Sequence, residues 1–467
     1  MRILLIEDED RSVRQAMAAI DRSANSATVD VASSRVDAER MIQDNEYDLV
    51  ICDLRIPPHS GSAEADESHG LAVHALARDL SPGTPLMFLT AYPVSGATRR
   101  QLSLGEVDSL LGLGRQPLVQ LVEKDDIDGV EEIISMIFNA MEAIESGCSI
   151  EPASLDEPIF QRAVKIYAAS TGHTRAVVQS TSGLSGAVVG RVKLQSDAVP
   201  PASIFLKVLP SEKARDEYGR YNQFVANRLP VGYFAPAMSP INAGLRKMSA
   251  LISTLADDDC CSLFDSLRDA PQKAVDAVEK LRVVTAPWCE NSAVVSTTVG
   301  ELRRSRLPDS YLTGLPIDAN ILRQIEETPV SFEQVAVHGD LHGENILLGS
   351  SSRPMLIDFG DSGLGYSPVD PITLELSLFF NKKGPGRDAE YEAGIDWSSW
   401  LDVDTCYGDS PLAEFAAACR AWAHQVADAK SIIAFGYAHS IRQLKYGDVN
   451  HTIALSIADA CIKQLTS

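Results

Sequence analysis

The sequence predicts an α/β fold for the N-terminal part of the chain and an α+β fold for the rest. Over residues 1–139, short and fully apolar runs alternate with stretches of helical character, which is typical of strands buried on both faces of a parallel sheet. From about residue 159, the pattern changes to closely spaced pairs of apolar runs and then to mostly helical sequence. With 467 residues, the chain is long enough for about three compact units.

The N-terminal part predicts a doubly wound sheet of five parallel strands. Its apolar runs lie at 3–6, 28–31, 49–52, 86–89 and 118–122. A helix is predicted at 129–147, and the sequence then becomes polar and contains prolines. We therefore interpret residues 1–140 as the first domain, and residues 141–158 as the end of this helix followed by a linker.

The segment 159–256 predicts a small α+β domain. Two strands flank the turn-like "TSGLSG" at 181–186, a third runs through "SIFLKVLP", and a fourth through "ALISTL". Residues 211–229 predict a helix, with Ser211 after Pro210 as its N-cap. The last segment, 257–467, is predicted to be mostly helical.

A polar motif interrupts this helical segment: "VHGDLHGENILLGSSSRPMLIDFGD", which begins at Val337. The Gly-Ser-Ser-Ser-Arg-Pro run between two apolar runs predicts a β-hairpin. If Leu348 pairs with Met355, the register places Asn345 opposite Asp358. Two such oxygen ligands suit Mg²⁺, which takes few protein ligands and completes its shell with phosphate and water. The alternative is a hairpin that ends in solvated acids.

This motif resembles the catalytic and metal-binding loops of the aminoglycoside phosphotransferase and choline kinase group, which has the bilobal protein-kinase-like fold. The resemblance covers roughly residues 160–467 and implies an ATP- and Mg²⁺-dependent phosphotransferase that acts on a hydroxyl group. The site residues that it implies are the catalytic Asp340, the Mg²⁺ ligands Asn345 and Asp358, and the loop-supporting His338 and Asp370. His342 is interpreted as a surface residue.

A kinase of this kind needs a strand lysine for the α- and β-phosphates and a helix glutamate to hold that lysine. Lys207 is the only lysine in "SIFLKVLP", and the alternative for it is an ordinary edge-strand lysine. Apolar residues recur on the following helix at Ala214, Tyr218, Tyr221 and Val225. Glu217 lies beside this stripe and Glu212 lies opposite, so Glu217 is the predicted partner of Lys207. The turn residues expected to cover the ATP phosphates with backbone N–H groups are Ser182, Gly183, Ser185 and Gly186, although they lack the GxGxxG pattern.

The N-terminal part resembles a response-regulator receiver domain. Functional residue types follow four of its predicted strands, at the edge where a doubly wound sheet gathers them: Glu7, Asp8, Asp53, Thr90 and Lys124. The resemblance implies that Glu7, Asp8 and Asp53 hold Mg²⁺ and that Asp53 is the phosphoacceptor. Thr90 and Lys124 would bind the phosphoryl oxygens and act as the switch.

Three features depart from that family. The loop after Asp53 contains the polar insert "RIPPHSGSAEADESHG", so Gly70 comes later than usual. The spacing from Thr90 to Lys124 is longer than usual, and Asp125 follows Lys124 where the family has proline. We interpret the domain as a receiver that is phosphorylated, and a degenerate receiver that only docks is the alternative.

Composition disfavours several classes of function. The net charge of −23 disfavours binding to nucleic acid and to anionic membranes. The 8 cysteines have no CxxC spacing, so neither a zinc site nor a disulfide framework is expected. No signal peptide and no membrane-spanning run is predicted, so a cytoplasmic location is expected.

Together these features predict a two-component-type signalling protein in which a receiver regulates a phosphotransferase. The cofactors expected are ATP, or another nucleoside triphosphate, and Mg²⁺. The partners expected are a sensor histidine kinase or another phosphodonor, a hydroxyl-bearing acceptor that is a small molecule rather than a protein, and a second copy of the receiver in a homodimer. The alternative function is a nucleotide-binding pseudokinase scaffold that the receiver controls or docks.

Overall fold

The computed structural model describes residues 1–91, 107–109, 111, 115–184, 187–255, 260–290, 292–312, 319–388, 391 and 394–466. The chain forms two compact units. The first unit consists of Met1–Asp216 and Ala237–Ala256, and the second of Glu217–Pro236 and Asp257–Ser467. The domain boundaries expected from the sequence stay predictions.

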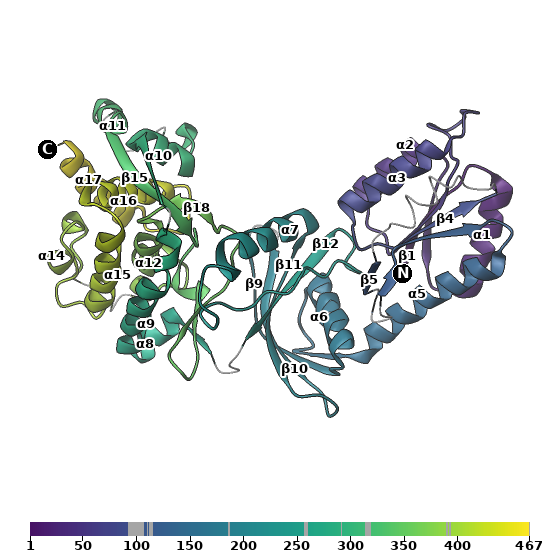
Figure 1. Cartoon of the computed structure of the whole chain (residues 1–467), viewed down its shortest axis with the longest axis horizontal. Coiled ribbons are helices and arrows are strands. Elements are labelled where there is room, and N and C mark those ends of the chain that lie inside the picture. The colour runs from purple at the N-terminus through teal and green to yellow at the C-terminus, as the bar shows by residue number, and fades with distance from the viewer. Residues whose placement is uncertain are drawn as a thin grey trace. The chain divides into compact units, whose positions relative to one another are not determined.

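The first unit begins with a five-stranded parallel sheet in the order β2-β1-β3-β4-β7 (Figure 1). The strands are β1 (Arg2–Ile6), β2 (Thr28–Ala32), β3 (Leu49–Asp53), β4 (Leu86–Thr90) and β7 (Val119–Glu123). The helices are α1 (Asp10–Ser23), α2 (Arg35–Asp44), α3 (Glu67–Leu80) and α5 (Ile127–Gly147). A small hairpin, β5 (Val107–Ser109) and β6 (Arg115–Pro117), lies between β4 and β7 in the chain. All five strands predicted from the apolar runs are confirmed.

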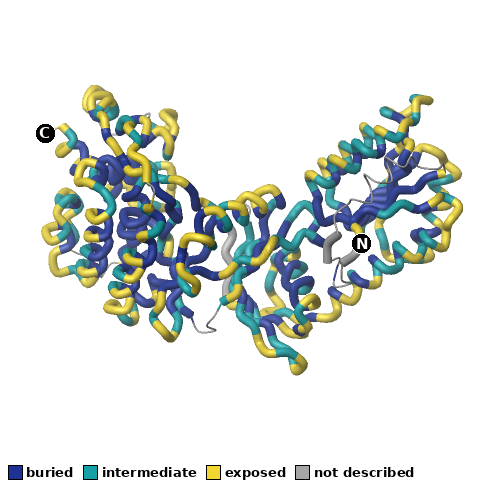
Figure 2. The backbone as a smooth tube through the Cα atoms, in the orientation of Figure 1, coloured by how far each residue is buried: buried dark blue, intermediate teal, exposed yellow. Residues whose placement is uncertain are grey.

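Alternate side chains of each strand enter two separate hydrophobic clusters. Ile3 and Leu5 pack in the cluster that includes α1 and α5, whereas Leu4 and Ile6 pack in the cluster that includes α2 and α3. All four side chains are fully buried, and Figure 2 shows this sheet as dark blue strands. Because helices cover both faces, every position of a central strand must be apolar, which explains the continuous runs in the sequence.

A second sheet in the same unit has the order β12-β11-β10-β9-β8. Its strands are β8 (Ser149–Glu151), β9 (Arg175–Leu184), β10 (Ala187–Gln195), β11 (Ala202–Pro210) and β12 (Met248–Leu255), and its helices are α6 (Pro158–Thr171) and α7 (Ser211–Arg220). The stretch interpreted as helix end and linker, 141–158, thus also contains β8, which pairs in parallel with β9. Ser211, predicted as an N-cap, is the first residue of α7, and its hydroxyl donates to the Lys247 carbonyl at 3.0 Å.

One hydrophobic cluster, which we call the shared core, extends from the N-terminal sheet to the second sheet. Its buried members include Ile51 and Met87 of the first sheet, Ile134 and Ile137 of α5, Phe160 and Val164 of α6, and Ile204 and Leu206 of β11. The outer residues of the α5 stripe, Ile133 and Met141, are partly buried against the same cluster. The two sheets therefore have one continuous interior rather than two separate ones.

An ion cluster joins the same two sheets at the amino-terminal edge of the first. Asp48 directly precedes β3 and is 5% exposed; it accepts hydrogen bonds from Arg162 at 2.9 Å and from Arg246 at 2.7 Å. Burial favours the neutral acid, but the two guanidinium groups hold the pKa of Asp48 below its usual value. The backbone at Gly83 also lies so close to the Asn242 carbonyl that a Cβ atom there would collide with it.

The second unit is mostly helical and contains two three-stranded sheets, β13-β16-β17 and β14-β15-β18. The strands are β13 (Cys261–Ser262), β14 (Ala293–Thr298), β15 (Pro329–Val337), β16 (Ile346–Leu348), β17 (Pro354–Leu356) and β18 (Gly363–Tyr366). The helices are the π-helix η1 (Tyr221–Ala226), α8 (Leu263–Asp269), α9 (Pro271–Val284), α10 (Val299–Arg306), α11 (Ala319–Glu326), α12 (Val369–Phe380), α14 (Val403–Tyr407), α15 (Ala413–Val426), α16 (Ala429–Gln443) and α17 (His451–Thr466). Every residue of α12 is buried, so this helix forms the centre of the unit.

The predicted hairpin of the polar motif is confirmed, but its predicted register is wrong by one residue. Leu347, rather than Leu348, pairs with Met355. The connection from residue 349 to residue 353 therefore has an odd number of residues, and Ser352 within it has a left-handed backbone with φ of 52°. As a result, Asn345 lies opposite Ile357, whose N–H donates to the Asn345 carbonyl at 3.0 Å, and Asp358 comes one residue later.

A buried ion pair lies inside the second unit. Glu375 of α12 is fully buried and accepts hydrogen bonds from Arg420 Nε at 2.6 Å and Arg420 Nη2 at 2.8 Å. The indole N–H of Trp400 and the hydroxyl of Tyr407 also donate to Glu375, at 2.9 and 3.1 Å. The Arg420 guanidinium lies 4.1 Å from the centre of the Trp400 ring. The pair thus connects α12 and α15 to the segment around Trp400.

Among the residues that the structure describes, no helix is both long enough and apolar enough to cross a membrane.

Candidate functional sites

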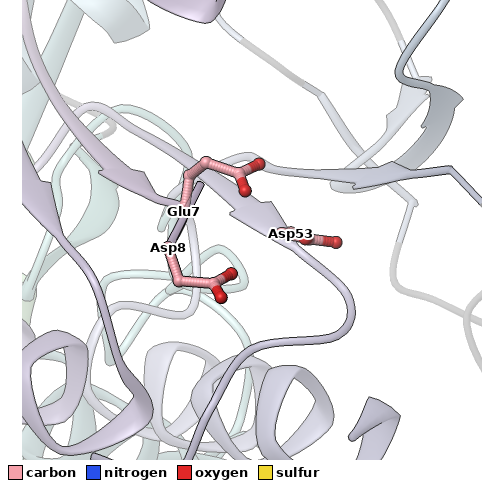
Figure 3. A group of neighbouring side chains, drawn as sticks. All are labelled: Glu7, Asp8 and Asp53. Atoms are coloured by element: carbon pink, nitrogen blue, oxygen red, sulfur yellow. The ribbon is translucent and has the colours of Figure 1, made fainter. Parts of the chain in front are cut away.

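Three carboxylates converge where β1 and β3 end (Figure 3). Glu7 and Asp8 follow β1, and Asp53 is the last residue of β3. One oxygen atom from each of the three side chains lies within 4.8 Å of the others. Glu7 and Asp53 are buried while Asp8 is exposed, so the cluster is open to solvent on one side. Carboxylate oxygens grouped in this way are ligands that Mg²⁺ prefers.

Lys124 and Thr90 lie at the same edge of the sheet. The Lys124 Nζ atom is 2.6 Å from Glu7 Oε2 and 2.8 Å from Asp53 Oδ2. The Lys124 backbone N–H donates to the Thr90 carbonyl at 2.8 Å, which holds the ends of β4 and β7 together. The fold therefore brings together all five residues selected from the strand ends of the sequence.

The electrostatic state of this cluster favours a cation. Burial raises the pKa of Glu7 to about 6, opposed by the hydrogen bond from Lys124 and reinforced by the charge of Asp53. Burial also raises the pKa of Asp53 above its usual value, again opposed by Lys124. Three carboxylates share one lysine, and a divalent ion would offset the remaining negative charge.

Binding of Mg²⁺ at this cluster is expected to weaken as the pH falls through about 6. A proton on Glu7 competes with the metal, so the Kd should rise by up to about 10-fold for each pH unit below the pKa of this group. Calorimetric titration of the nucleotide-free chain with Mg²⁺ between pH 5 and 7.5 measures this effect. Glu7→Gln should flatten the pH dependence, and an unchanged slope in that variant would contradict the assignment.

A buried aspartate holds the loop that follows β15. Asp370, on the first turn of α12, is 3% exposed and accepts hydrogen bonds from the backbone N–H groups of His338 at 2.8 Å and Gly339 at 3.0 Å. His338 is fully buried, and its Nε2 atom lies 3.0 Å from the Ile357 carbonyl oxygen. These contacts tie the loop to both α12 and the hairpin.

Asp340 and Asn345 lie on this loop in direct contact. The Asn345 side-chain amide donates to the Asp340 backbone carbonyl at 2.9 Å, so its carboxamide oxygen remains available to a ligand. Asn345 is 6% exposed, whereas the Asp340 side chain is 45% exposed and can meet a substrate. Asp358 has a left-handed backbone with φ of 63°, which turns the chain out of the hairpin. A non-glycine residue in this conformation is uncommon and often marks a functional site.

Aromatic packing fixes the segment after Asp358. The Phe359 ring lies 5.6 Å from the His338 ring and 5.5 Å from the Tyr221 ring, between centroids. Glu217 is buried in the second unit, as its position beside the apolar stripe predicted. A Cβ atom placed on Gly360 would lie 3.1 Å from Glu217 Oε2 and 3.6 Å from Asp358 Oδ1, so both carboxylates lie close to this glycine.

The other residues expected to bind nucleotide belong to the first unit. Lys207 lies on β11, paired with Val189 of β10 and Leu251 of β12. Ser182 and Gly183 lie within β9, near its end. Ser185 and Gly186 lie outside the described residues.

The sequence did not indicate several basic side chains near Asp340. His342, interpreted from the sequence as a surface residue, is 21% exposed, and its Nε2 atom lies 3.7 Å from Asp340 Oδ2. Burial and the charge of Arg442 lower the pKa of Arg306, and the charge of Asp340 opposes these larger effects by raising it. The segment "ELRRSR" contains three arginines, and no spacing in it distinguishes Arg306 from the other two.

Family models match two segments of the chain. Residues 3–112 match the response regulator receiver domain, and residues 290–400 match the phosphotransferase enzyme family. No curated protein matches the chain. The N-terminal segment is therefore similar to receiver domains, and residues 290–400 are similar to phosphotransferases, which in general use a nucleotide and a divalent metal.

Two receiver domains and one choline kinase are among the solved structures similar to the chain. The Francisella response regulator 1452 receiver domain is 17% identical, with 30% of this chain and 96% of that chain covered and a TM-score of 0.21. A CheY-like receiver domain protein from Methanospirillum hungatei is 16% identical, with 30% and 96% covered and a TM-score of 0.21. Choline kinase LicA from Streptococcus pneumoniae is 12% identical, with 65% and 97% covered and a TM-score of 0.36.

Proposed function

We propose that the protein is a two-component-type regulator in which phosphorylation of Asp53 controls an ATP- and Mg²⁺-dependent phosphotransferase that acts on the hydroxyl group of a small molecule. The observation that carries this proposal is the arrangement of the loop after β15. Asp370 holds its backbone, Asn345 is bonded to it, and Asp340 remains exposed at its tip. The loop backbone is thus fixed while the Asp340 carboxylate stays exposed, which is the arrangement that an acceptor-binding carboxylate requires.

In this proposal, Asp340 orients the acceptor hydroxyl and accepts its proton. The hydroxyl oxygen forms a bond to the γ-phosphorus of ATP, the bond from that phosphorus to the bridging oxygen breaks, and ADP leaves. Asn345 and Asp358 would hold Mg²⁺, which supplies positive charge to the phosphate oxygens when bound. Lys207, supported by Glu217, would bind the α- and β-phosphates, and backbone N–H groups of the segment from Ser182 to Gly186 would cover them.

Isotope tracing tests the activity. Full-length protein with Mg²⁺ and ATP labelled at the γ-phosphate is expected to transfer the label to a hydroxyl-bearing small molecule. Binding of ATP without turnover on any acceptor would instead support the pseudokinase scaffold. Absence of nucleotide binding would contradict both the phosphotransferase and the pseudokinase scaffold.

For regulation, we propose that a cytoplasmic phosphodonor such as a sensor histidine kinase phosphorylates Asp53. A route from this site to the second sheet passes through Leu111, a described residue between Thr90 and Lys124 in the sequence. Leu111 is 5% exposed and belongs to the shared core. Its side chain packs against the backbone at Gly244, as does the side chain of Ile166 of α6. A change at Thr90 and Lys124 can thus reach the nucleotide-binding sheet by packing alone.

Beryllium fluoride with Mg²⁺, which mimics a phosphoryl group on Asp53, is expected to change kcat of the phosphotransferase. Typical coupling energies of about 1–3 kcal/mol correspond to roughly 5- to 150-fold changes. Steady-state kinetics with and without the mimic measure this, and Asp53→Asn should abolish the response. Identical kinetics in the wild type with and without the mimic would identify the receiver as a docking module.

A further inference from the structure

The second unit contains a cavity of about 450 Å³. It is lined by the end of α9, by β14 and β15, and by the connection from α15 to α16; α9, α15, α16 and β15 are labelled in Figure 1. Its volume lies within the range of about 300–1,000 Å³ that is typical of small-molecule sites. From β15 the lining takes Ser331, Phe332 and Glu333, and among the described residues it includes none of the loop that follows this strand. The cavity is therefore separate from the loop that carries Asp340.

Two polar groups on the wall of this cavity lack hydrogen-bond partners. Ser367 is 6% exposed, and its hydroxyl has no partner within the described part of the chain. Its backbone N–H, in contrast, donates to the Glu333 carbonyl at 3.0 Å. The Arg282 Nε atom is also buried without a partner, although another nitrogen of the same guanidinium group lies 2.5 Å from Glu279 Oε2. Because a buried polar group without a partner is costly, both groups are available to an acceptor atom in the cavity.

Two carboxylates also line the cavity. Glu333 of β15 and Asp428, the N-cap of α16, are both exposed, so they lie at its rim. Asp428 accepts a hydrogen bond from the Ser431 backbone N–H at 2.7 Å, and Glu333 accepts one from the Ser292 hydroxyl at 3.2 Å. Within the residues that the structure describes, neither carboxylate forms an ion pair. The cavity thus offers hydrogen-bond donors to an anionic group and, separately, carboxylates to a cationic group.

Apolar side chains form the rest of the wall. Phe332 is 1% exposed, Val426 is half-buried, and Val294 is 72% exposed although it lines the cavity. Burial raises the pKa of the Cys289 thiol, so this half-buried residue is uncharged. His424 lies exposed at the rim. A ligand with an apolar part would bury Val294 and gain the free energy of that burial.

We infer that this cavity binds a zwitterionic small molecule with an apolar side chain, of which an apolar amino acid is the simplest form. Its carboxylate accepts hydrogen bonds from Arg282 and Ser367, and its ammonium group lies against Glu333 or Asp428. Charge-assisted hydrogen bonds of this kind are stronger than those between neutral groups. An anion alone would be repelled by the two carboxylates, and a cation alone would leave Arg282 and Ser367 without partners. The inference does not depend on the proposed phosphotransferase activity.

Calorimetric titration of the full chain with L-valine, L-leucine, L-methionine and L-phenylalanine tests the class of ligand. At least one of the four is expected to bind. The amine and the carboxylic acid that each lack one charged group of that amino acid should bind at least about 10-fold more weakly. For leucine, these probes are 3-methylbutylamine and 4-methylpentanoate. Absence of binding by all four amino acids up to about 10 mM, or equal binding of the amine or the acid, would overturn the inference.

Substitutions in the wall test the place of binding. Arg282→Gln is expected to weaken binding of the amino acid roughly 10- to 100-fold, and Ser367→Ala roughly 3- to 10-fold. The double variant Glu333→Gln with Asp428→Asn should also weaken it roughly 10- to 100-fold, and asparagine retains the N-cap of α16. Glu279→Gln is the matched control, because it removes the ion pair of Arg282 without touching the cavity, and it should change the Kd by less than about twofold. A loss in Glu279→Gln equal to that in Arg282→Gln, or unchanged binding in Arg282→Gln, would contradict the site.

The same titration with Asp340→Asn separates this inference from the proposed function. Because no residue of the loop after β15 lines the cavity within the described part of the chain, the Kd for the amino acid should be unchanged in this variant. Loss of binding in Asp340→Asn would place the ligand at the proposed acceptor site and overturn the inference. Binding that depends on Arg282 and Ser367, together with no phosphoryl transfer by the wild type to any acceptor, would support the cavity and contradict only the phosphotransferase.

Discussion

Asp340→Asn is expected to reduce kcat for phosphoryl transfer by about 10²- to 10⁴-fold and to leave the Kd for ATP in the presence of Mg²⁺ nearly unchanged. The expected loss is large because a carboxamide cannot accept the proton of the acceptor hydroxyl. The side chain is half-exposed, and the hydrogen bond from Asn345 goes to its backbone carbonyl rather than to its carboxylate. Substitution therefore removes the chemical function while the loop keeps its structure.

Asp358→Asn is the informative comparison. Its carboxylate is proposed to hold the metal, so this variant should weaken nucleotide binding with Mg²⁺ and leave metal-free binding unchanged. Fluorescence titration with an ATP analogue, with Mg²⁺ and with EDTA, gives both Kd values for both variants. Equal losses of binding in Asp340→Asn and Asp358→Asn would show that the two roles are assigned wrongly.

Arg420→Met is expected to destabilise the second unit by about 3–5 kcal/mol. Removing Arg420 leaves the Glu375 carboxylate fully buried with only the neutral donors of Trp400 and Tyr407. The cation–π contact with Trp400 is lost at the same time. Methionine fills much of the arginine volume, so the charge rather than a cavity dominates the loss.

Urea denaturation followed by tryptophan fluorescence measures this effect, because all four tryptophans lie in the second unit. Lys463→Met is the control, since Lys463 pairs with Asp459 on the surface of α17 and should contribute less than about 1 kcal/mol. If the two variants have the same midpoint, the buried pair does not stabilise the fold.

The strands of the N-terminal sheet were predictable because each of their residues must be apolar. A strand covered on both faces must be apolar throughout, so each run in the sequence gave its strand within one residue at either end. The strand ends then followed from parallel topology, and Glu7, Asp53 and Lys124 meet as expected. For these strands, the apolar runs visible in the sequence are the same residues that burial between two layers of helices requires.

Features that depend on contacts between distant segments were not predictable. The hairpin of the catalytic motif was recognised, but its register depends on the conformation of Ser352 in the turn, which side-chain types do not specify. The strand β8 has three residues, too few for a pattern to appear, and exists because β9 offers it an edge. The contact between the Arg306 guanidinium and the Phe435 ring joins two residues that are distant in the sequence, and no local pattern indicates it.

The shared core has a consequence for how such a protein can arise and be altered. Signalling modules that touch only through surface loops can be recombined by moving the gene segment of one in front of another. Here the last helix of the receiver, α5, supplies Ile134 and Ile137 to the same interior that holds Phe160 and Leu206. A receiver domain taken from another regulator would have a last helix whose outer face is polar. The apolar side chains of α6 that α5 now buries would then be exposed to solvent. Descent of this architecture therefore requires the two parts to have changed together, and a functional chimera would have to carry the α5 surface with it.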